Sequence, residues 1–214
     1  RYDRLASDRA GITVSEGNRL IVVAPAAVAA GTPLFTRIAQ DLHQRTFDEL
    51  LRLPGVIPGA RVAIKPHPRC DEFAFYDELQ RRGTPGVEFL DRGVSLHALL
   101  PQAGLVILPN TPTDAALEAI VFGVPVLFIS AAWQDAFDSG FNGPEEASMQ
   151  AMVVRDLDRI ASTVQAVLDG GETRDRVVAA NAELLRHWAG TLDGGAVRRS
   201  AERIMATLES SPRR

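Results

Sequence analysis

The segment Leu108-Pro109-Asn110-Thr111-Pro112-Thr113-Asp114-Ala115-Ala116-Leu117-Glu118-Ala119-Ile120-Val121-Phe122-Gly123-Val124-Pro125-Val126 predicts a strand end, a tight turn, a helix and a second strand. Thr111 suits the N-cap of that helix, Pro112 its first position, and Asp114 completes a capping box. Gly123, with a proline close behind, predicts the helix end. A strand joined through a helix to a following strand is the repeating unit of a parallel sheet.

Similar apolar runs occur along most of the chain, rich in Val, Ile, Leu and Phe and mostly continuous, as in strands buried on both faces. They predict strands at 20–26, 61–68, 87–91, 105–110, 124–130 and 151–154. Helical patterns lie between and after them, at 34–53, 71–82, 95–101, 112–122, 157–169, 174–189 and 195–209. The sequence therefore predicts an α/β fold: a Rossmann-like, doubly wound parallel sheet of about six strands with extra C-terminal helices. We expect one domain at 19–214, preceded by a linker or N-terminal helix at 1–18.

The composition narrows the class of protein. Of 214 residues 46% are hydrophobic, enough for a real core, and the net charge of −4 without a basic run disfavours nucleic acid as a partner. A single cysteine, Cys70, leaves no internal disulfide framework. Apolar runs fall short of the roughly 20 residues of a membrane span, so we expect a cytoplasmic protein, with attachment to the inner face of the cell membrane compatible with that location. Because the chain begins Arg1-Tyr2-Asp3-Arg4 without Met, we expect a fragment of a longer protein.

The chain's only lysine lies in Lys65-Pro66-His67-Pro68-Arg69, directly after a predicted strand. At every other position with a Lys or Arg, the chain has arginine, so a lysine here indicates a position that needs a compact ammonium group. His67 can bind a phosphate or titrate, and the two prolines stiffen the turn. From these five residues alone, an anion pocket and an ordinary strand end with an exposed histidine are equally good interpretations.

Ligands of parallel sheets bind beyond the carboxyl ends of the strands, where the strand order reverses. Pro25, His67, Asp91 and Thr111 follow the first four predicted strands and should meet at that edge. The glycine-rich dinucleotide fingerprint and the Walker loop are both absent from the sequence, which disfavours NAD binding and P-loop hydrolysis.

The start of the predicted helix adds an anion site to this edge, because helix N–H groups point toward the N-terminus. The hydroxyls of Thr111 and Thr113 offer further donors, although capping alone explains these residues as well. Thr111, Asp114 and Glu118 share one helix face, which suits a nucleotide phosphate at the cap and its ribose near Glu118.

Other polar residues have simpler interpretations. Asp91 and Arg92 border a possible base pocket, but a turn-forming Asp is the simpler interpretation. His97, behind Ser95 as N-cap, is typical of a surface helix residue, and His43 and His187 have polar helical surroundings.

The order of these motifs resembles the C-terminal, donor-binding half of GT-B glycosyltransferases over about residues 20–170. The segments that carry the resemblance are residues 65–69, Val94-Ser95-Leu96-His97-Ala98-Leu99-Leu100, and the helix with Glu118-Ala119 and Gly123-Val124-Pro125-Val126. The chain is most similar to the families that build bacterial surface polymers: capsule Kdo transferases, CDP-glycerol glycerophosphotransferases and sialyltransferases with a His-Pro motif. The resemblance implies transfer of a sugar or glycerophosphate from a cytidine-linked donor to a bacterial surface polysaccharide, with the glycan acceptor held by a separate N-terminal domain.

The resemblance also implies roles for individual residues. His67 would contact the donor phosphate as the catalytic group, Thr111 and Thr113 would bind the same phosphate, and Glu118 would contact the ribose. Lys65 and Arg69 match the phosphate site, while Pro25 and Asp91 border the ribose and base. Many family members have adjacent hydroxyl residues at the cap, whereas Pro112 separates the two threonines here. We expect neither a metal nor any cofactor other than the nucleotide donor.

Two other functions fit the same residues. A nucleotide-sugar epimerase of the UDP-GlcNAc 2-epimerase type shares the fold and the segment from Glu118 to Val126. The other is a non-catalytic module, which would bind a nucleotide or glycan in the same pocket but would not catalyse a reaction.

Overall fold

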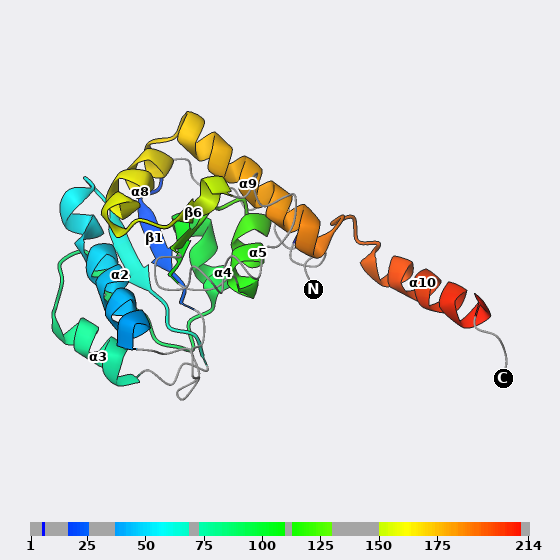
Figure 1. The fold of residues 1–214 in the computed structure, drawn as a ribbon, viewed down its shortest axis with the longest axis horizontal. Coiled ribbons are helices and arrows are strands. Elements are labelled where there is room, and N and C mark those ends of the chain that lie inside the picture. The colour runs from blue at the N-terminus through cyan, green and yellow to red at the C-terminus, as the bar shows by residue number, and fades with distance from the viewer. Residues whose placement is uncertain are drawn as a thin grey trace.

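The computed structural model describes residues 6, 17–25, 37–68, 73–109, 113–129 and 150–210, and the six strands found there form one parallel sheet (Figure 1). The strands are β1 (Leu20–Val23), β2 (Arg61–Ile64), β3 (Val87–Phe89), β4 (Ala103–Leu108), β5 (Val126–Ile129) and β6 (Val153–Val154). Their order is β3-β2-β1-β4-β5-β6, so the direction of winding reverses between β1 and β4. The predicted Rossmann-like fold is confirmed, and each predicted strand overlaps one of the six, although β4 begins two residues earlier than predicted.

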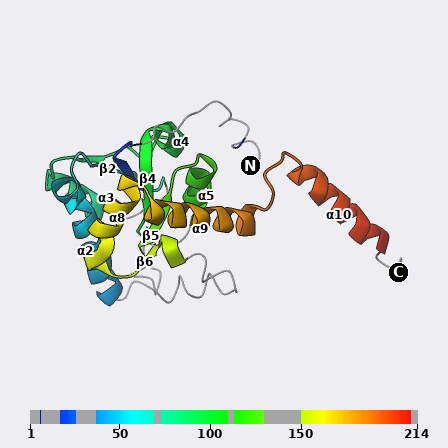
Figure 2. The same ribbon diagram turned by 90° about the horizontal axis from the view of Figure 1, so that it is seen from above.

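The sheet is flanked by helices on both sides. The helices are α2 (Arg37–Val56), α3 (Phe73–Arg81), α4 (Leu96–Leu99), α5 (Asp114–Val121), α8 (Ile160–Asp169), α9 (Glu172–Ala189) and α10 (Ala196–Ser210), with 3₁₀ turns at 100–102, 150–152 and 157–159. α2 packs against β2 and α8, whereas α5 packs against β4, β5 and α9. Figure 2 shows α2, α3 and α8 to one side of the strands and α5 to the other, with α10 projecting away from the domain. In the described part of the chain, no helix is both long enough and apolar enough to cross a membrane.

The central strands are buried along their whole length, which explains their continuous apolar sequence. All six residues of β4 and all four of β5 are buried. The ladder between β1 and β4 contains a bulge: Leu20 pairs with Ala103 and Ile21 with Leu105, which leaves Gly104 as the extra residue. A Cβ at Gly104 would lie 1.8 Å from the carbonyl oxygen of Asn18, so the close backbone approach requires glycine.

Helix α5 begins later than predicted. Thr113 has an extended backbone (φ −135°, ψ 168°) and is the N-cap, so the prediction of Thr111 as N-cap with Pro112 in the first helical position is wrong. Asp114 consequently occupies the first helical position and cannot complete the predicted capping box. The helix end is confirmed, because Gly123 has φ +77° and its N–H, together with that of Val124, closes the last turn on Ile120 and Ala119.

His43 has an apolar environment, contrary to the prediction of polar surroundings. It is 2% exposed on α2, and its ring lies 5.0 Å from the rings of both Phe47 and Phe75, next to Tyr76. Phe75 and Tyr76 belong to the short helix α3. The sequence of α3 alone does not show that it packs against α2. Burial lowers the pKa of His43 to about 4, so the imidazole is neutral near pH 7.

Candidate functional site

A cavity of about 620 Å³ lies beyond the carboxyl ends of β1 and β2, beside the start of α5. Its size falls within the range of small-molecule sites. Its lining comes from four segments: Ala24, Pro25, Lys65, His67, Pro68, Arg92, Gly93, Val94, Ser95, Leu96, Thr113, Asp114, Ala115 and Glu118. The cavity therefore lies where the strand order reverses, which is the usual ligand position in open parallel sheets.

The structure brings most of the predicted site residues together. Pro25, Lys65, His67, Thr113 and Glu118 all line this cavity. Their segments are held in register by the sheet, since the Lys65 N–H donates to Val23 O at 2.9 Å and the Ala24 N–H to Ile107 O at 2.9 Å. Two further predicted residues, Arg69 and Thr111, lie outside the described residues.

Asp91 lies outside this set. It lines a neighbouring cavity of about 340 Å³ with Pro66, Tyr76, Asp77, Gln80, Phe89, Leu90 and Arg92. Its carboxylate accepts a hydrogen bond from the Gly93 N–H at 2.7 Å, and the Val94 N–H donates to its carbonyl at 3.1 Å. Asp91 thus shapes the turn that presents 92–96 to the larger cavity, in line with the simpler interpretation of this residue. Arg92 lines both cavities.

Lys65 is the buried cation of the site. It is 8% exposed, and its ammonium donates to Pro66 O at 3.3 Å. Burial lowers the pKa of Lys65, and the negative charge of Glu118 partly opposes that shift. A poorly hydrated ammonium on a cavity wall gains more than an exposed one from contact with an anionic ligand.

The start of α5 adds polar groups to the same cavity. Thr113, the N-cap, makes no side-chain capping bond, so its hydroxyl is not committed to the helix end. The first N–H groups of a helix lack intrahelical acceptors and carry the positive end of the helix dipole. Asp114 is exposed in the first turn and brings a negative charge to the same end.

Glu118 is a buried carboxylate on the cavity-facing side of α5. The residue is 7% exposed, although it sits one turn after the helix start. Nε2 of His97 lies 3.1 Å from Oε2 of Glu118, and the His97 ring stacks on Phe122 with centroids 5.7 Å apart. The sequence-based interpretation of His97 as a surface residue missed this contact, because no spacing rule connects α4 with α5 across β4.

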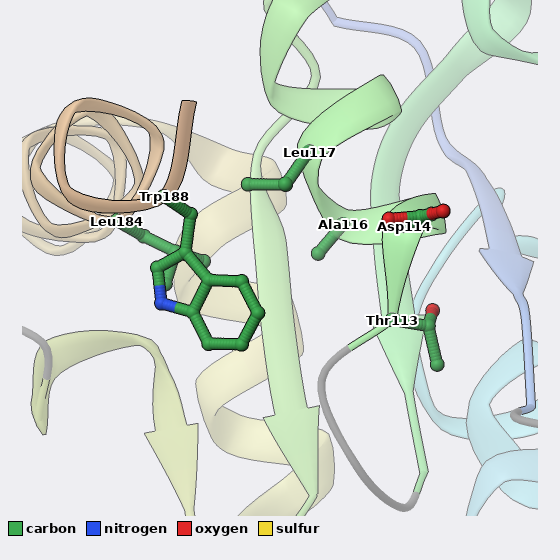
Figure 3. A pocket seen from close by; sticks show the side chains of 6 residues that line it. All are labelled: Thr113, Asp114, Ala116, Leu117, Leu184 and Trp188. Atoms are coloured by element: carbon green, nitrogen blue, oxygen red, sulfur yellow. The ribbon is translucent and has the colours of Figure 1, made fainter. Parts of the chain in front are cut away.

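A smaller apolar cavity of about 140 Å³ shares two residues with the larger one. It lies between α5 and α9 and is lined by Thr113, Asp114, Ala116, Leu117, Leu184 and Trp188. Figure 3 shows the Trp188 indole facing Ala116 and Leu117, while the side chains of Thr113 and Asp114 point away from it. The N-terminus of α5 thus separates an apolar pocket from the polar cavity. Within the described residues, no group of three or more His, Cys, Asp or Glu could hold a metal ion.

Fold and cavity together define a Rossmann-like α/β domain with a polar ligand cavity at the reversal of strand order. No family model and no curated protein matches the sequence. Among solved structures, Anabaena HepE, crystallised with UDP-glucose, superposes with a TM-score of 0.50 at 14% identity, covering 95% of this chain and 52% of HepE. The C-terminal domain of the glycosyl transferase group 1 family protein LpcC from Francisella tularensis gives 0.48 at 14% identity, covering 87% of this chain and 91% of that domain.

A variant of the wall teichoic acid polymerase TagF gives a TM-score of 0.49 at 11% identity, covering 96% of this chain and 48% of TagF. The chain thus spans about half the length of HepE and of TagF. The likeness to HepE identifies the fold as that of one Rossmann-like domain of a GT-B architecture.

Proposed function

We propose that the chain is the donor-binding domain of a GT-B glycosyltransferase, which binds a cytidine-linked sugar or glycerophosphate. The observation that carries this proposal is the single cavity that joins Lys65, His67 and the start of α5 to Glu118 at the reversal of strand order. The resemblance of the sequence motifs to the surface-polymer transferases supports the same function.

The charges of the cavity suit a nucleotide. Lys65, His67 and the N-terminus of α5 offer donors and positive potential for a phosphate. Glu118 lies five residues after Thr113, about 7.5 Å along the helix at 1.5 Å per residue. A carboxylate at that distance can accept hydrogen bonds from ribose hydroxyls while the phosphate occupies the helix start. The polar backbone of 92–96 forms the remaining wall, where a base would lie.

The same groups explain how transfer would be accelerated. When a sugar or glycerophosphate leaves its nucleotide, the C–O or P–O bond to the leaving phosphate breaks and negative charge grows on that phosphate. Lys65 and the helix N-terminus are fixed before the reaction, so they stabilise the developing charge more than the ground state. His67 can donate a hydrogen bond or a proton to the leaving oxygen. These groups would perform the task that a divalent metal performs elsewhere.

The acceptor would bind to a companion domain. We propose a bacterial surface polysaccharide as acceptor, with the catalytic base contributed from that second half, and a cytoplasmic site of action near the inner face of the membrane. Release of CMP or CDP from the donor would then require both halves. A non-catalytic module would bind the donor and release no nucleotide under these conditions.

A ligand panel tests the proposal on the 214-residue chain. CMP, CDP, CDP-glycerol, UDP-glucose and UDP-GlcNAc are compared by thermal shift and by calorimetry, each with EDTA and with Mg²⁺. A cytidine nucleotide at 100-fold its Kd should raise the Tm by about 5–10 °C, equally with either additive. Absence of binding by every nucleotide would refute the function. Binding of UDP-glucose alone would refute the cytidine preference, preference for UDP-GlcNAc would favour an epimerase, and binding that requires Mg²⁺ would refute metal independence.

A further inference from the structure

We propose that His97 is a positioning residue, which holds the Glu118 carboxylate in place for the ribose hydroxyls and so makes the site selective for ribonucleotides. This inference rests on the proposed function and assigns a role to a residue on a different element, α4. The observations that carry it are the 3.1 Å separation of His97 Nε2 and Glu118 Oε2 and the stacking of the same ring on Phe122.

The first step of the argument concerns the cost of burying Glu118. Its side chain is 9% exposed, and a buried carboxylate is unfavourable unless neighbouring charges and donors compensate it. Lys65 supplies one positive charge near it. When a phosphate enters the cavity, it competes with Glu118 for that same ammonium. The imidazole of His97 is a second polar group in contact with the carboxylate, and it belongs to α4 and not to the phosphate-binding segment 65–68.

The second step concerns geometry. Phe122, the C-cap of α5, follows Glu118 by four residues, so both side chains lie on one helix stripe, and the His97 ring contacts both. The ring lies nearly parallel to Phe122, with an interplanar angle of 20°. This stacking fixes the ring plane and holds the buried Nε2 close to Oε2, in a polar contact that lacks the alignment of a hydrogen bond. A carboxylate has two oxygens and several acceptor directions, so this contact is compatible with acceptance of ribose hydroxyls by the same group.

The third step concerns the cavity walls. His97 directly follows the segment 92–96, and both that segment and Glu118 line the cavity. The contact between His97 and Glu118 therefore links two segments that line the same cavity, α5 and the turn before α4. His97 itself is 41% exposed and is not among the residues that line the cavity, so it acts through Glu118.

The test separates positioning from a general structural effect. Calorimetry measures the binding of CDP and of 2′,3′-dideoxy-CDP, with UDP and its dideoxy analogue in parallel, to the wild type, to His97→Phe and to His97→Gln. The phenylalanine keeps a ring on Phe122 but loses the nitrogen, whereas glutamine restores a donor. His187→Phe, at an exposed position on α9, is the matched control.

We expect His97→Phe to weaken binding of the ribonucleotide about tenfold, which lies within the range of couplings between groups in contact. Binding of the dideoxy analogue should not change, and His97→Gln should recover part of the loss. An equal loss for both nucleotides, or no loss for either, would overturn the inference, as would a wild type that does not distinguish ribose from dideoxyribose. Failure of the wild type to bind any of the four nucleotides would instead refute the proposed function.

Discussion

The side chain of Asn181 on α9 takes the place of a strand neighbour for Val126. The Val126 N–H donates to Asn181 Oδ1 at 2.7 Å, and Asn181 Nδ2 donates to Val126 O at 3.1 Å. The neighbouring strand β6 pairs only from Phe128 onward, so its two residues do not reach the start of β5. A side-chain amide, which has both a donor and an acceptor, completes the ladder and ties α9 to the sheet.

Replacement of Asn181 by Ala should destabilise the domain by about 2–4 kcal/mol, because it leaves a buried N–H and a buried C=O without these bonds. Asn181 is 3% exposed, so water cannot readily replace the amide. Urea unfolding followed by circular dichroism measures the change. Arg176→Ala on the same helix, where the side chain is exposed, should change stability by less than about 0.5 kcal/mol. Equal effects of the two substitutions would contradict this role of Asn181.

A second prediction of stability concerns the bulge at Gly104. Gly104→Ala would place a Cβ 1.8 Å from the backbone oxygen of Asn18, so the chain must move, at a cost of at least about 2 kcal/mol. Gly55→Ala is the matched control, since a Cβ there meets nothing within 4 Å on helix α2. The control should be neutral or stabilising, because alanine favours helix over glycine. A Gly104→Ala variant with the wild-type urea midpoint would show that the backbone approach is not needed.

The fold could be predicted from the sequence because its signals are local. Each central strand is a continuous apolar run, and Gly123 marks the end of α5 through its backbone alone. The contacts that complete the molecule are not local. Asn181 and Val126 are 55 residues apart, and His97 meets Glu118 only because β4 returns the chain between them. No periodicity links such residues, so neither contact could be predicted.

In the candidate site too, residues marked by local signals could be predicted, and contacts between distant segments could not. Pro25, Lys65, His67, Thr113 and Glu118 were predicted because each follows a strand or lies near a helix start, and such positions meet at one edge of a parallel sheet. The burial of His43 could not be predicted, because it depends on the contact of its ring with Phe75 on α3. The sequence of that nine-residue helix does not determine which of its rings face α2.

The lowered pKa of the buried His43 should make the stability of the domain depend on pH. Burial lowers its folded pKa to about 4 from an ordinary value of 6.5. Between these values the unfolded chain binds a proton at His43 that the folded chain does not bind, so acid favours unfolding. Its contribution to stability is fully present above pH 6.5 and is lost as the pH falls to about 4. The loss should approach about 3 kcal/mol, at 1.36 kcal/mol per unit.

Urea unfolding of the wild type and of His43→Phe at pH 7 and at pH 4 measures this contribution. The phenylalanine cannot titrate, so the variant should lose about 3 kcal/mol less than the wild type over this range. His43→Leu serves as a second non-titrating variant if the larger ring disturbs the packing. Parallel losses in the wild type and both variants would show that His43 does not carry the acid sensitivity.

His67 tests the phosphate end of the proposed site. It follows β2, is half-buried and lines the cavity beside Lys65, so the phosphate of a bound nucleotide would lie within its reach. His67→Ala should weaken the binding of CDP by about 1–3 kcal/mol, the range for a hydrogen bond to a charged group. Calorimetry with CDP and with cytidine, which lacks phosphate, separates this effect from a general disturbance: cytidine should bind both proteins equally. His187→Ala is the control for loss of an imidazole from the surface, and it should leave the affinity for CDP unchanged. If His67→Ala binds CDP as tightly as the wild type does, the imidazole does not contact the phosphate, and Lys65 with the start of α5 must hold it without His67.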